Sequence, residues 1–341
     1  MDSSGGDDCS SQKKKKVLCV GNVCLDLINV AQEYPQEDSD QKGLEHYWQR
    51  GGNATNNCTV LSILSVPCEF MGVLGNQGAE ARWIQDDYDK FGIKTTNCVT
   101  KPVQNSVATA IISQVTGSRT ILYYPRDRPE LTYNEFHENF HGDFTPYSWV
   151  HFELGRSVDE TSHMIDDVVA FNNVHNLPRA PDSQRQRVII SVEYEKPELK
   201  NPESEMGKAD IVFLSKDVAK FRGYSNAVLA VEGLQHLCKD GAVLVCAWGD
   251  AGAAARYRDQ TLTAPALTDI KVVDTLGAGD TFIAGFISRL WKNGWACADC
   301  VGRDTESSII ANAIQYACVL AGLKCTMFGY QGLKQHLSSI V

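Results

Sequence analysis

Val273-Asp274-Thr275-Leu276-Gly277-Ala278-Gly279-Asp280-Thr281-Phe282 is the stretch of sequence from which both the fold and the chemistry can be inferred. Apolar residues follow it at helical spacing, at Phe282, Ile283, Phe286, Ile287 and Leu290. A Gly-Ala-Gly run that opens a helix leaves backbone N–H groups unpaired, with no large side chain over them. The helix N-terminus also carries partial positive charge. The turn is therefore predicted to bind an anion, and phosphate suits it best.

Asp280 stands inside this predicted anion site. A carboxylate beside a bound anion is unfavourable unless it accepts a proton from a hydroxyl that attacks the anion. We therefore interpret Gly277, Ala278 and Gly279 as an anion hole and Asp280 as the general base of phosphoryl transfer to an alcohol. The alternative is a Gly-rich strand-to-helix turn in which Asp280 only caps the helix, because short Gly motifs often match by chance. Neither G-x-x-x-x-G-K-[ST] nor G-x-G-x-x-G occurs, which excludes a P-loop and a dinucleotide oxidoreductase.

Composition sets the broad class of the protein. The chain has 341 residues, 43% hydrophobic and 22% charged, as expected for one large globular α/β domain. A net charge of −10 with no basic stripe argues against a nucleic-acid surface. No apolar run approaches the ~20 residues that span a bilayer, so we expect no membrane contact. The 12 cysteines are scattered and no secretory segment opens the sequence, which favours reduced thiols and a cytoplasmic location.

Strand and helix patterns alternate along the chain. Residues 1–15 read as a disordered, Lys-rich tail, and 16–341 as a single domain. Strands are predicted at Val17–Val20, Cys24–Val30, Glu69–Gly75, Trp149–Phe152, Val188–Val192, Ile211–Ser215 and Ala242–Gly249, with a hairpin of 107–113 and 120–124. Helices are predicted at Gly78–Phe91 and at Asp304–Ala321, the second closed by Gly322. Such alternation favours a doubly wound α/β sheet.

A second informative segment lies near the start, at Trp48-Gln49-Arg50-Gly51-Gly52-Asn53-Ala54-Thr55-Asn56-Asn57. Its paired glycines let a ligand approach the backbone, and Asn53 and Asn56 stand about one helical turn apart. Two amides at that spacing can hydrogen-bond adjacent hydroxyls of a sugar. Asp26 interrupts an apolar strand and is costly to bury unless a polar group meets it. It is either an edge-strand acid facing solvent or part of the same polar site.

Together, Gly51–Asn56 and Asp274–Asp280 resemble the two signatures of the ribokinase-like carbohydrate kinases, in the same order and separation. The likeness extends over Gly117–Tyr124, Val212–Lys220 and Val243–Trp248, and covers the chain from about residue 17 onward. The resemblance implies an α/β fold, a three-layer α/β/α sandwich with a small β-sheet lid. Residues 24–48 and 104–124 would form the lid, and two lids would clasp to make a homodimer.

The likeness is greatest to members of that family that phosphorylate fructose. It implies transfer of the γ-phosphoryl group of ATP to the 1-hydroxyl of D-fructose, with Mg²⁺ and K⁺. Residues that match the family's sugar contacts are Asp26, Asp38, Gly52, Asn53, Asn56 and Asp280. Residues that match its ATP contacts are Arg119, Gly252, Gly277 and Cys325. Asp274 and the Leu276 carbonyl match the groups that hold the monovalent cation.

Two segments depart from the family pattern. His151–Arg156 is one residue longer than its counterpart, so the resemblance assigns no role to Glu153 or Arg156. Ser215–Val218 stands where many members have Asn-x-x-Glu to order Mg²⁺ waters, which leaves the Mg²⁺ ligands unassigned. A kinase of the same family for another sugar or a nucleoside is the alternative. A sugar-binding regulator without turnover is disfavoured, because a binder has no use for the base of an intact Gly-Ala-Gly-Asp.

Overall fold

The structure is a computed structural model and describes residues 15–155, 157–175, 187–199, 202–295 and 303–337. Nearly all of the predicted tail, most of the loop around residue 180, and Arg156 lie outside these ranges. The helices are α1 (Asn53–Ile63), α2 (Ala79–Lys90), α3 (Tyr133–Phe140), α4 (Val158–His175), α5 (Glu203–Lys208), α6 (Lys216–Phe221), α7 (Ala227–Leu234), α8 (Ala278–Lys292), α9 (Arg303–Lys324) and α10 (Leu333–His336). In the part of the chain so described, no helix has the length and apolar character needed to cross a bilayer.

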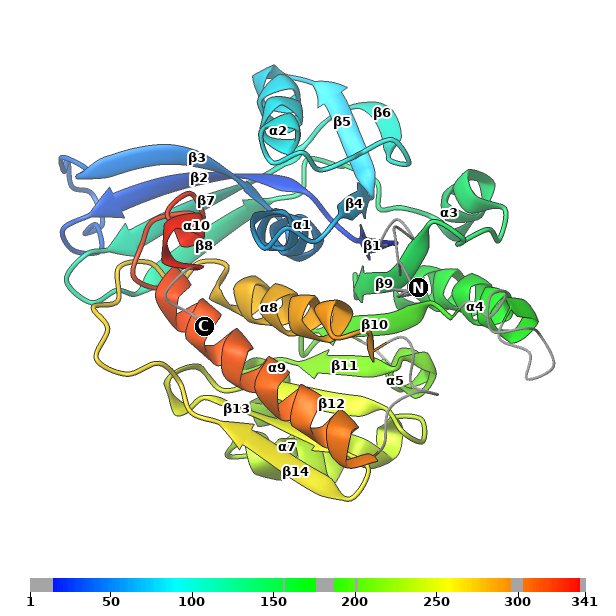
Figure 1. Cartoon of the computed structure of the whole chain (residues 1–341). Coiled ribbons are helices and arrows are strands. Elements are labelled where there is room, and N and C mark those ends of the chain that lie inside the picture. Colours follow the sequence, from blue (N-terminus) through cyan, green and yellow to red (C-terminus); the bar gives the residue numbers. More distant parts are fainter. Residues whose placement is uncertain (1–14, 156, 176–186, 200–201, 296–302, 338–341) are drawn as a thin grey trace, which may run out of the picture.

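An eight-stranded sheet forms the centre of the molecule (Figure 1). Its strands are β1 (Lys16–Val20), β4 (Cys68–Met71), β9 (Tyr147–Glu153), β10 (Ile189–Tyr194), β11 (Ile211–Leu214), β12 (Val243–Ala247), β13 (Ala253–Tyr257) and β14 (Gln260–Ala264). The spatial order is β14-β13-β12-β11-β10-β9-β1-β4. The six strands from β12 to β4 run parallel, and β13 and β14 add an antiparallel edge.

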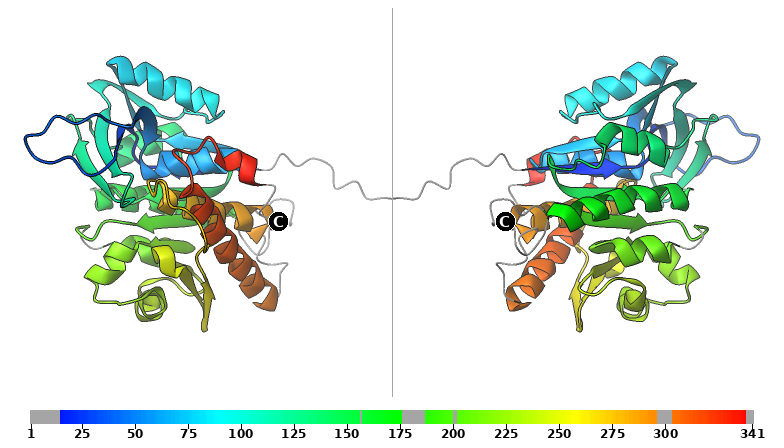
Figure 2. Two further views of the ribbon diagram at one scale, coloured as in Figure 1. Left: turned by 90° about the vertical axis from the view of Figure 1, so that its left-hand side faces the viewer. Right: turned by 90° about the vertical axis from the view of Figure 1, so that its right-hand side faces the viewer.

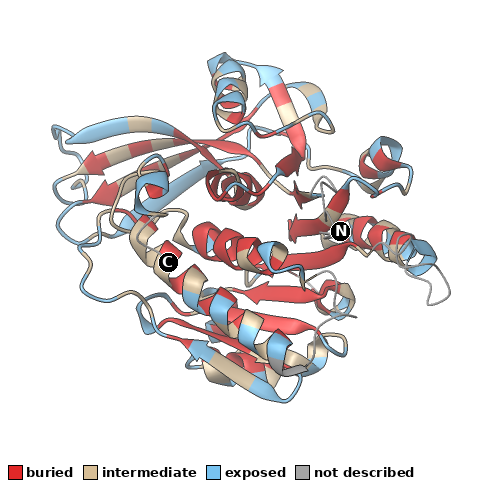
Figure 3. Cartoon of the chain, viewed as in Figure 1, coloured by how far each residue is buried: buried red, intermediate tan, exposed pale blue. Residues whose placement is uncertain are grey.

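Helices cover both faces of this sheet (Figure 2). Alternate residues of each strand enter two separate cores, since successive side chains point to opposite faces. On β11, for example, Ile211 and Phe213 pack with helices α1, α8 and α9, whereas Val212 and Leu214 pack with α4 and α7. The parallel strands are buried throughout, which explains their continuous apolar sequences (Figure 3). The predicted doubly wound α/β class is confirmed.

A second, four-stranded sheet projects beyond one end of the central sheet (Figure 1). It consists of β2 (Cys24–Ala31), β3 (Glu45–Gly51), β7 (Ser106–Ser113) and β8 (Arg119–Tyr124), in the order β3-β2-β7-β8. Its inner face presents Ile28, Val30, Ala110 and Ile112 to Leu276 and Phe328 of the main body. The apolar contact holds this sheet over the loop that precedes α8. A third, two-stranded sheet of β5 (Val73–Gln77) and β6 (Val99–Gln104) lies beside α2.

The structure differs from the sequence-based assignment at three places. The predicted strand Glu69–Gly75 is two strands, β4 and β5, that belong to different sheets and are separated by Gly72. A Cβ at Gly72 would lie 2.4 Å from the Gly21 carbonyl oxygen, so only glycine allows the chain to turn there. Helix α9 does not end before Gly322 but continues to Lys324. Gly322 serves close packing instead, because its Cβ would lie 2.5 Å from Cβ of Leu267. The β13–β14 hairpin was not predicted at all.

Candidate active site

The Gly-Ala-Gly turn opens α8 as the sequence predicts. Gly277 is the residue before the helix and has φ 74°, in the left-handed region that glycine favours. A Cβ at Gly277 would lie 1.9 Å from the Tyr330 hydroxyl, so a side chain is excluded there. A Cβ at Gly279, in contrast, would meet nothing within 4 Å. The start of α8 is therefore open on the side of Gly279, which leaves room for an anion there, although the Ala278 N–H donates to the Thr275 carbonyl at 3.2 Å.

Asp280 lies in the first turn of α8 and is buried, with 7% of its surface exposed. Its Oδ2 accepts a hydrogen bond of 2.7 Å from Nδ2 of Asn56 in α1, so the two segments singled out from the sequence meet here. Burial raises the pKa of Asp280 to about 8, and the nearby charge of Glu195 adds to the effect. The Asn56 hydrogen bond opposes the shift. The result is a carboxyl group that titrates near neutral pH.

Asp26 lies on β2 and faces inward rather than into solvent. Its Oδ1 accepts a hydrogen bond from the Cys24 thiol at 3.2 Å, and burial raises its pKa to about 6. The carboxylate occupies the space where a Gly51 side chain would stand, because a Cβ there would lie 2.2 Å from Oδ2. Gly51 thus has a structural reason to be glycine. The first glycine of the pair makes room for Asp26.

Three further acids, none with a role assigned from the sequence, lie close to Asp280. Glu153 ends β9, and its Oε2 accepts hydrogen bonds of 3.1 Å from the backbone N–H groups of Asn22 and Ala54. Glu193 lies near the end of β10 and Glu195 follows that strand. Both accept from Nδ2 of Asn53, at 3.0 and 2.9 Å. Burial raises the pKa of Glu193 well above its usual range, with Asp280 and Glu195 as further causes. Adjacent parallel strands β9 and β10 end at the same edge, which brings these acids together.

Several buried polar atoms around this cluster have no hydrogen-bond partner among the described residues. They are Oδ1 of Asn56, Oε2 of Glu193, both side-chain polar atoms of Gln49, and the hydroxyls of Tyr47 and Tyr330. Buried polar groups in native proteins are almost always paired, so such a concentration needs an explanation. A polar ligand with many hydroxyl or phosphate oxygens would supply the missing partners.

Arg119 and Asp274 flank the same turn. Nη1 of Arg119, at the start of β8, donates to Oγ1 of Thr275 at 2.6 Å, which places this guanidinium beside the anion turn. Oδ1 of Asp274 accepts from the Leu276 N–H at 2.8 Å. Its Oδ2 accepts from Nζ of Lys324 at 2.6 Å, in an ion pair in which both side chains are almost fully buried. No pattern in the sequence singles out Lys324.

Comparison with known proteins agrees with this geometry. The family model described as "pfkB family carbohydrate kinase" matches residues 14–335. The chain is 38% identical over 324 residues to ketohexokinase of Mus musculus, covering 94% of this chain and 99% of the relative. The chain belongs to the pfkB family of carbohydrate kinases. It is also 25% identical over 289 residues to a fructokinase of Rhizobium leguminosarum bv. trifolii, covering 80% and 79% of the two chains.

Solved structures of similar fold extend over the whole domain. The ribokinase of Giardia lamblia matches with a TM-score of 0.75 at 17% identity, over 95% of this chain and 98% of its own. A fructokinase with bound ATP from Xylella fastidiosa matches with a TM-score of 0.73 at 17% identity, over 96% and 98%. The predicted ribokinase-like fold is therefore confirmed, and the protein is a carbohydrate kinase.

In this pfkB kinase, Gly252 and Cys325 both contact the loop between β14 and α8, at its two ends. Gly252 has φ 84°, and its Cβ would lie 2.1 Å from the Ala264 carbonyl oxygen, at the end of β14. The following loop reaches Leu267, which packs against Gly322 in the last turns of α9. The Cys325 carbonyl accepts from the N–H groups of Val273 and Asp274, at 2.7 and 3.2 Å. Cys325 therefore stands where this loop meets the end of α9, and Gly252 stands where the loop begins.

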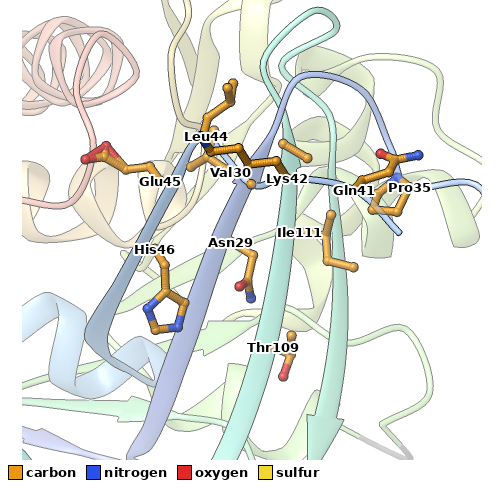
Figure 4. Close-up of a pocket in the computed structure, with 12 residues that line it drawn as sticks. Asn29, Val30, Pro35, Gln41, Lys42, Leu44, Glu45, His46, Thr109 and Ile111 are labelled. Atoms are coloured by element: carbon orange, nitrogen blue, oxygen red, sulfur yellow. The ribbon is translucent and has the colours of Figure 1, made fainter. Parts of the chain in front are cut away.

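Asp38 is a candidate that the structure does not bring to this cluster. It lies in the exposed loop between β2 and β3, beyond Ala31. Ala31 itself is five residues, or about 16 Å of extended strand, away from Asp26. The same loop borders a pocket of about 440 Å³ whose lining includes Asn29, Gln41, His46 and Thr109 (Figure 4). Because Asn29 and Asp26 point to opposite faces of β2, this pocket is on the outer face and is separate from the acidic cluster around Asp280.

Proposed function

We propose that this chain transfers the γ-phosphoryl group of ATP to the 1-hydroxyl of D-fructose, giving fructose 1-phosphate and ADP. The observation that carries the proposal is Asp280, a buried acid that titrates near neutral pH within the open Gly-Ala-Gly turn. Two named relatives support the substrate, since one is a ketohexokinase and the other a fructokinase.

Sugar hydroxyls would satisfy the unpaired atoms of the cluster. Asn56 presents a free carbonyl oxygen next to Asp280, and Asp26 presents a carboxylate from the inner face of β2. Gly52 has φ 103°, and a Cβ there would meet the Asn22 carbonyl oxygen at 2.2 Å, so only glycine fits at the start of α1, beside Asn53. Asn53 binds Glu193 and Glu195 through Nδ2, which leaves its carbonyl oxygen for the sugar. Together these groups would orient one hydroxyl toward Asp280.

In the proposed phosphoryl transfer step, Asp280 and the anion turn act together. Asp280 accepts the proton of the attacking hydroxyl while the new O–P bond forms and the bond from the γ-phosphorus to the ADP oxygen breaks. A base with a pKa of about 8 is well matched to operation near neutral pH. The N–H groups of Gly277 to Gly279 and the Arg119 guanidinium stabilise the charge on the transferring group. Gly252 and Cys325 would border the adenosine end of ATP.

Mg²⁺ is expected with ATP, and the acids at the end of β10 fit it. Within the described ranges, no group of three or more His, Cys, Asp and Glu side chains is arranged to hold a metal ion. Mg²⁺ commonly uses only one or two carboxylates together with substrate phosphates and water. Glu193, whose Oε2 has no hydrogen-bond partner and lies 3.9 Å from Nε2 of His151, and Glu195 are the residues that would hold it. The ion would neutralise phosphate charge and, with it, part of the repulsion among these acids.

K⁺ does not fit in the same way. Asp274 and Leu276 were the residues expected to hold it, but Oδ2 of Asp274 is occupied by the ammonium group of Lys324 at 2.6 Å. A second cation at that oxygen would face a buried positive charge. No step of the proposed mechanism therefore depends on a monovalent cation.

The four-stranded sheet would act as the lid over the sugar and as the surface of a homodimer. Its outer face carries Trp48, Leu122 and Tyr124, each more than a third exposed, beside the pocket of Figure 4. Apolar side chains gathered on one face of a sheet are typical of an interface. A clasp of two such faces would also explain Asp38, which is too far from its own site and would reach the sugar of the partner subunit. The described cysteines are all free, as expected for a cytoplasmic enzyme.

A coupled ADP-release assay tests the function. Purified protein with Mg²⁺ and ATP is compared on fructose, tagatose, ribose and adenosine, and the product is located by ³¹P–¹H correlation NMR. We expect turnover on fructose with the phosphate on the 1-oxygen. Preference for ribose or adenosine would replace the substrate but keep the mechanism, because pocket changes shift specificity by only ~1–3 kcal/mol. Tight sugar binding without ADP release would show a sugar-binding regulator instead.

A further inference from the structure

Lys324 is the last residue of α9, and its ammonium group is completely buried. Nζ contacts three oxygen atoms: Oδ2 of Asp274 at 2.6 Å, the Asp274 carbonyl at 3.3 Å and the Met327 carbonyl at 3.5 Å. The Tyr330 ring centroid lies 5.7 Å away. A carboxylate oxygen with backbone carbonyl oxygens is the kind of ligand set that also binds an inorganic cation.

This ion pair is connected directly to the anion turn. Asp274 stands three residues before Gly277, and its other carboxylate oxygen fixes the Leu276 N–H at 2.8 Å. Lys324 lies over the ring of Tyr330, and the Tyr330 hydroxyl occupies the space where a Gly277 side chain would stand. The single charge of Lys324 thus holds both the loop that leads into the turn and the segment behind it.

Burying a lysine is costly unless its charge is needed and compensated. The pKa of Lys324 is lowered by burial, while Asp274 opposes that change. A purely structural link between α9 and the loop could be made from apolar side chains at lower cost. A positive charge behind a phosphate-binding turn has a further effect, because it adds to the field that stabilises the transferring group.

We propose that Lys324 is an internal replacement for the monovalent cation expected at Asp274, so that this kinase positions its anion turn without K⁺. The inference rests on the proposed kinase function. Lys324 is a positioning residue, since it acts on the turn through Asp274 and touches no reacting atom. The ammonium group supplies the three donors that these oxygen atoms can accept, in the place of a dehydrated ion.

The first test is the salt dependence of the unmodified protein. Turnover of fructose and ATP is measured at equal ionic strength in KCl, NaCl and choline chloride, because unmatched salt would change electrostatic screening. We expect kcat and KM for ATP to agree within about twofold in the three salts. More than tenfold activation by K⁺ over choline would overturn the proposal.

The second test exposes the cation site. Lys324→Ala removes the ammonium and leaves room, so kcat/KM for ATP should fall at least tenfold in choline chloride and recover in KCl or NH₄Cl. Lys324→Met fills the space without charge and should lose activity without recovery. Lys208→Met, which removes a lysine paired with Asp166 far from the turn, is the control and should behave as wild type in all salts. Full activity of folded Lys324→Ala in choline would also overturn the proposal.

Melting temperatures keep the inference separate from the kinase function. If the unmodified protein phosphorylates no acceptor in any salt, the proposed function fails, but the cation site is still decided by thermal melts. We expect K⁺ to raise the Tm of Lys324→Ala relative to choline and to leave that of the unmodified protein unchanged. A K⁺-specific rise in the unmodified protein would refute the replacement. If Lys324→Ala does not fold, the unmodified protein alone tests the proposal, by its activity in the three salts and by whether K⁺ raises its Tm.

Discussion

Asp280→Asn separates a catalytic from a structural acid, because the two roles predict opposite effects on activity and stability. The substitution keeps the shape of the side chain, and its carbonyl oxygen can still accept the Asn56 hydrogen bond. It removes the basicity and the charge. If Asp280 is the general base, kcat should fall by ~10²–10⁴ while KM for ATP changes little. A merely structural acid predicts near-normal kcat and a lower Tm.

The stability effect can be worked out from the pKa of Asp280, which rises from an ordinary 3.8 to about 8. Between these values the folded state holds a proton that the unfolded state has lost. The group's contribution to stability is therefore complete below pH 4 and is lost as the pH rises to 8. The shift corresponds to ~6 kcal/mol at most. Neighbouring acids can relieve part of the repulsion by taking up a proton themselves, so we expect Asp280→Asn to gain about 2–4 kcal/mol above pH 8.

The assay is a pair of measurements on one preparation, kcat by coupled ADP release and Tm in buffers from pH 5 to 9. With an unfolding entropy of roughly 0.7 kcal/mol/K for a chain of this length, the gain corresponds to a Tm about 3–6 °C higher at pH 8.5. The gain should shrink toward pH 5. Asp210→Asn is the matched control, because Asp210 is buried but paired with Arg187 and Lys239, and it should lose Tm and keep kcat. Turnover of Asp280→Asn within a few-fold of wild type would refute the mechanism.

Four more outcomes are expected. The kcat/KM for fructose of the unmodified enzyme should rise with pH toward a plateau above about 8, since the base acts only when deprotonated, and a flat profile from pH 6 to 9 would count against Asp280. Asp26→Ala should raise KM for fructose by the equivalent of ~2–4 kcal/mol, and unchanged fructose affinity would remove Asp26 from the sugar site. Arg119→Lys keeps the charge but loses the planar fork, so kcat/KM for ATP should fall by roughly 5- to 30-fold, and an unchanged kcat/KM for ATP would count against a phosphate contact of Arg119. Asp38→Ala and Asp280→Asn, each inactive alone, should regain activity when co-expressed with different tags and purified as a heterodimer, because one of its two sites combines intact Asp280 with the partner's intact Asp38. A heterodimer as inactive as the parents would show that Asp38 does not act across the interface.

The central sheet was predictable because its strands are buried on both faces. Val17–Val20 and Ala242–Gly249 are continuous apolar runs, and such runs belong to parallel strands covered by helices. The β13–β14 hairpin gave no comparable signal. Ala253-Ala254-Ala255 has low strand propensity and no alternation, so only pairing with β12 makes it a strand. The predictions at Gly72 and Gly322 were wrong for another reason. Each glycine is needed at a close contact between segments, and that contact exists only in the folded chain.

The site was predictable where chemistry and backbone geometry coincide in one short segment. Gly277 to Asp280 is such a segment, and so is Gly51 to Asn56. Glu193 and Glu195 were missed because an acid at the end of a strand usually faces solvent. Their role depends on the neighbouring strand β9 and on Asn53, which is 140 residues away from Glu193 along the chain. Lys324 was missed for the same reason, since its partner Asp274 is separated from it by 50 residues.

The acids around Asp280 should also lower the stability of this region of the protein. Glu153, Glu193 and Asp280 are buried, and burial raises the pKa of each. Folding therefore brings together acidic groups that repel one another. This raises the free energy of the folded state, and good packing alone does not require it. Hydrogen bonds from Asn22, Ala54, Asn53 and Asn56 and the charge of Lys196 offset part of this cost, whereas Arg119 and Lys324 contact the anion turn and the loop before it. The unbalanced charge is then available to the reaction, because one acid must accept a proton and the others must attract a metal ion with its phosphates. Binding of sugar, Mg²⁺ and ATP should accordingly stabilise this protein more at pH 8.5 than at pH 6, where protonation already relieves the repulsion.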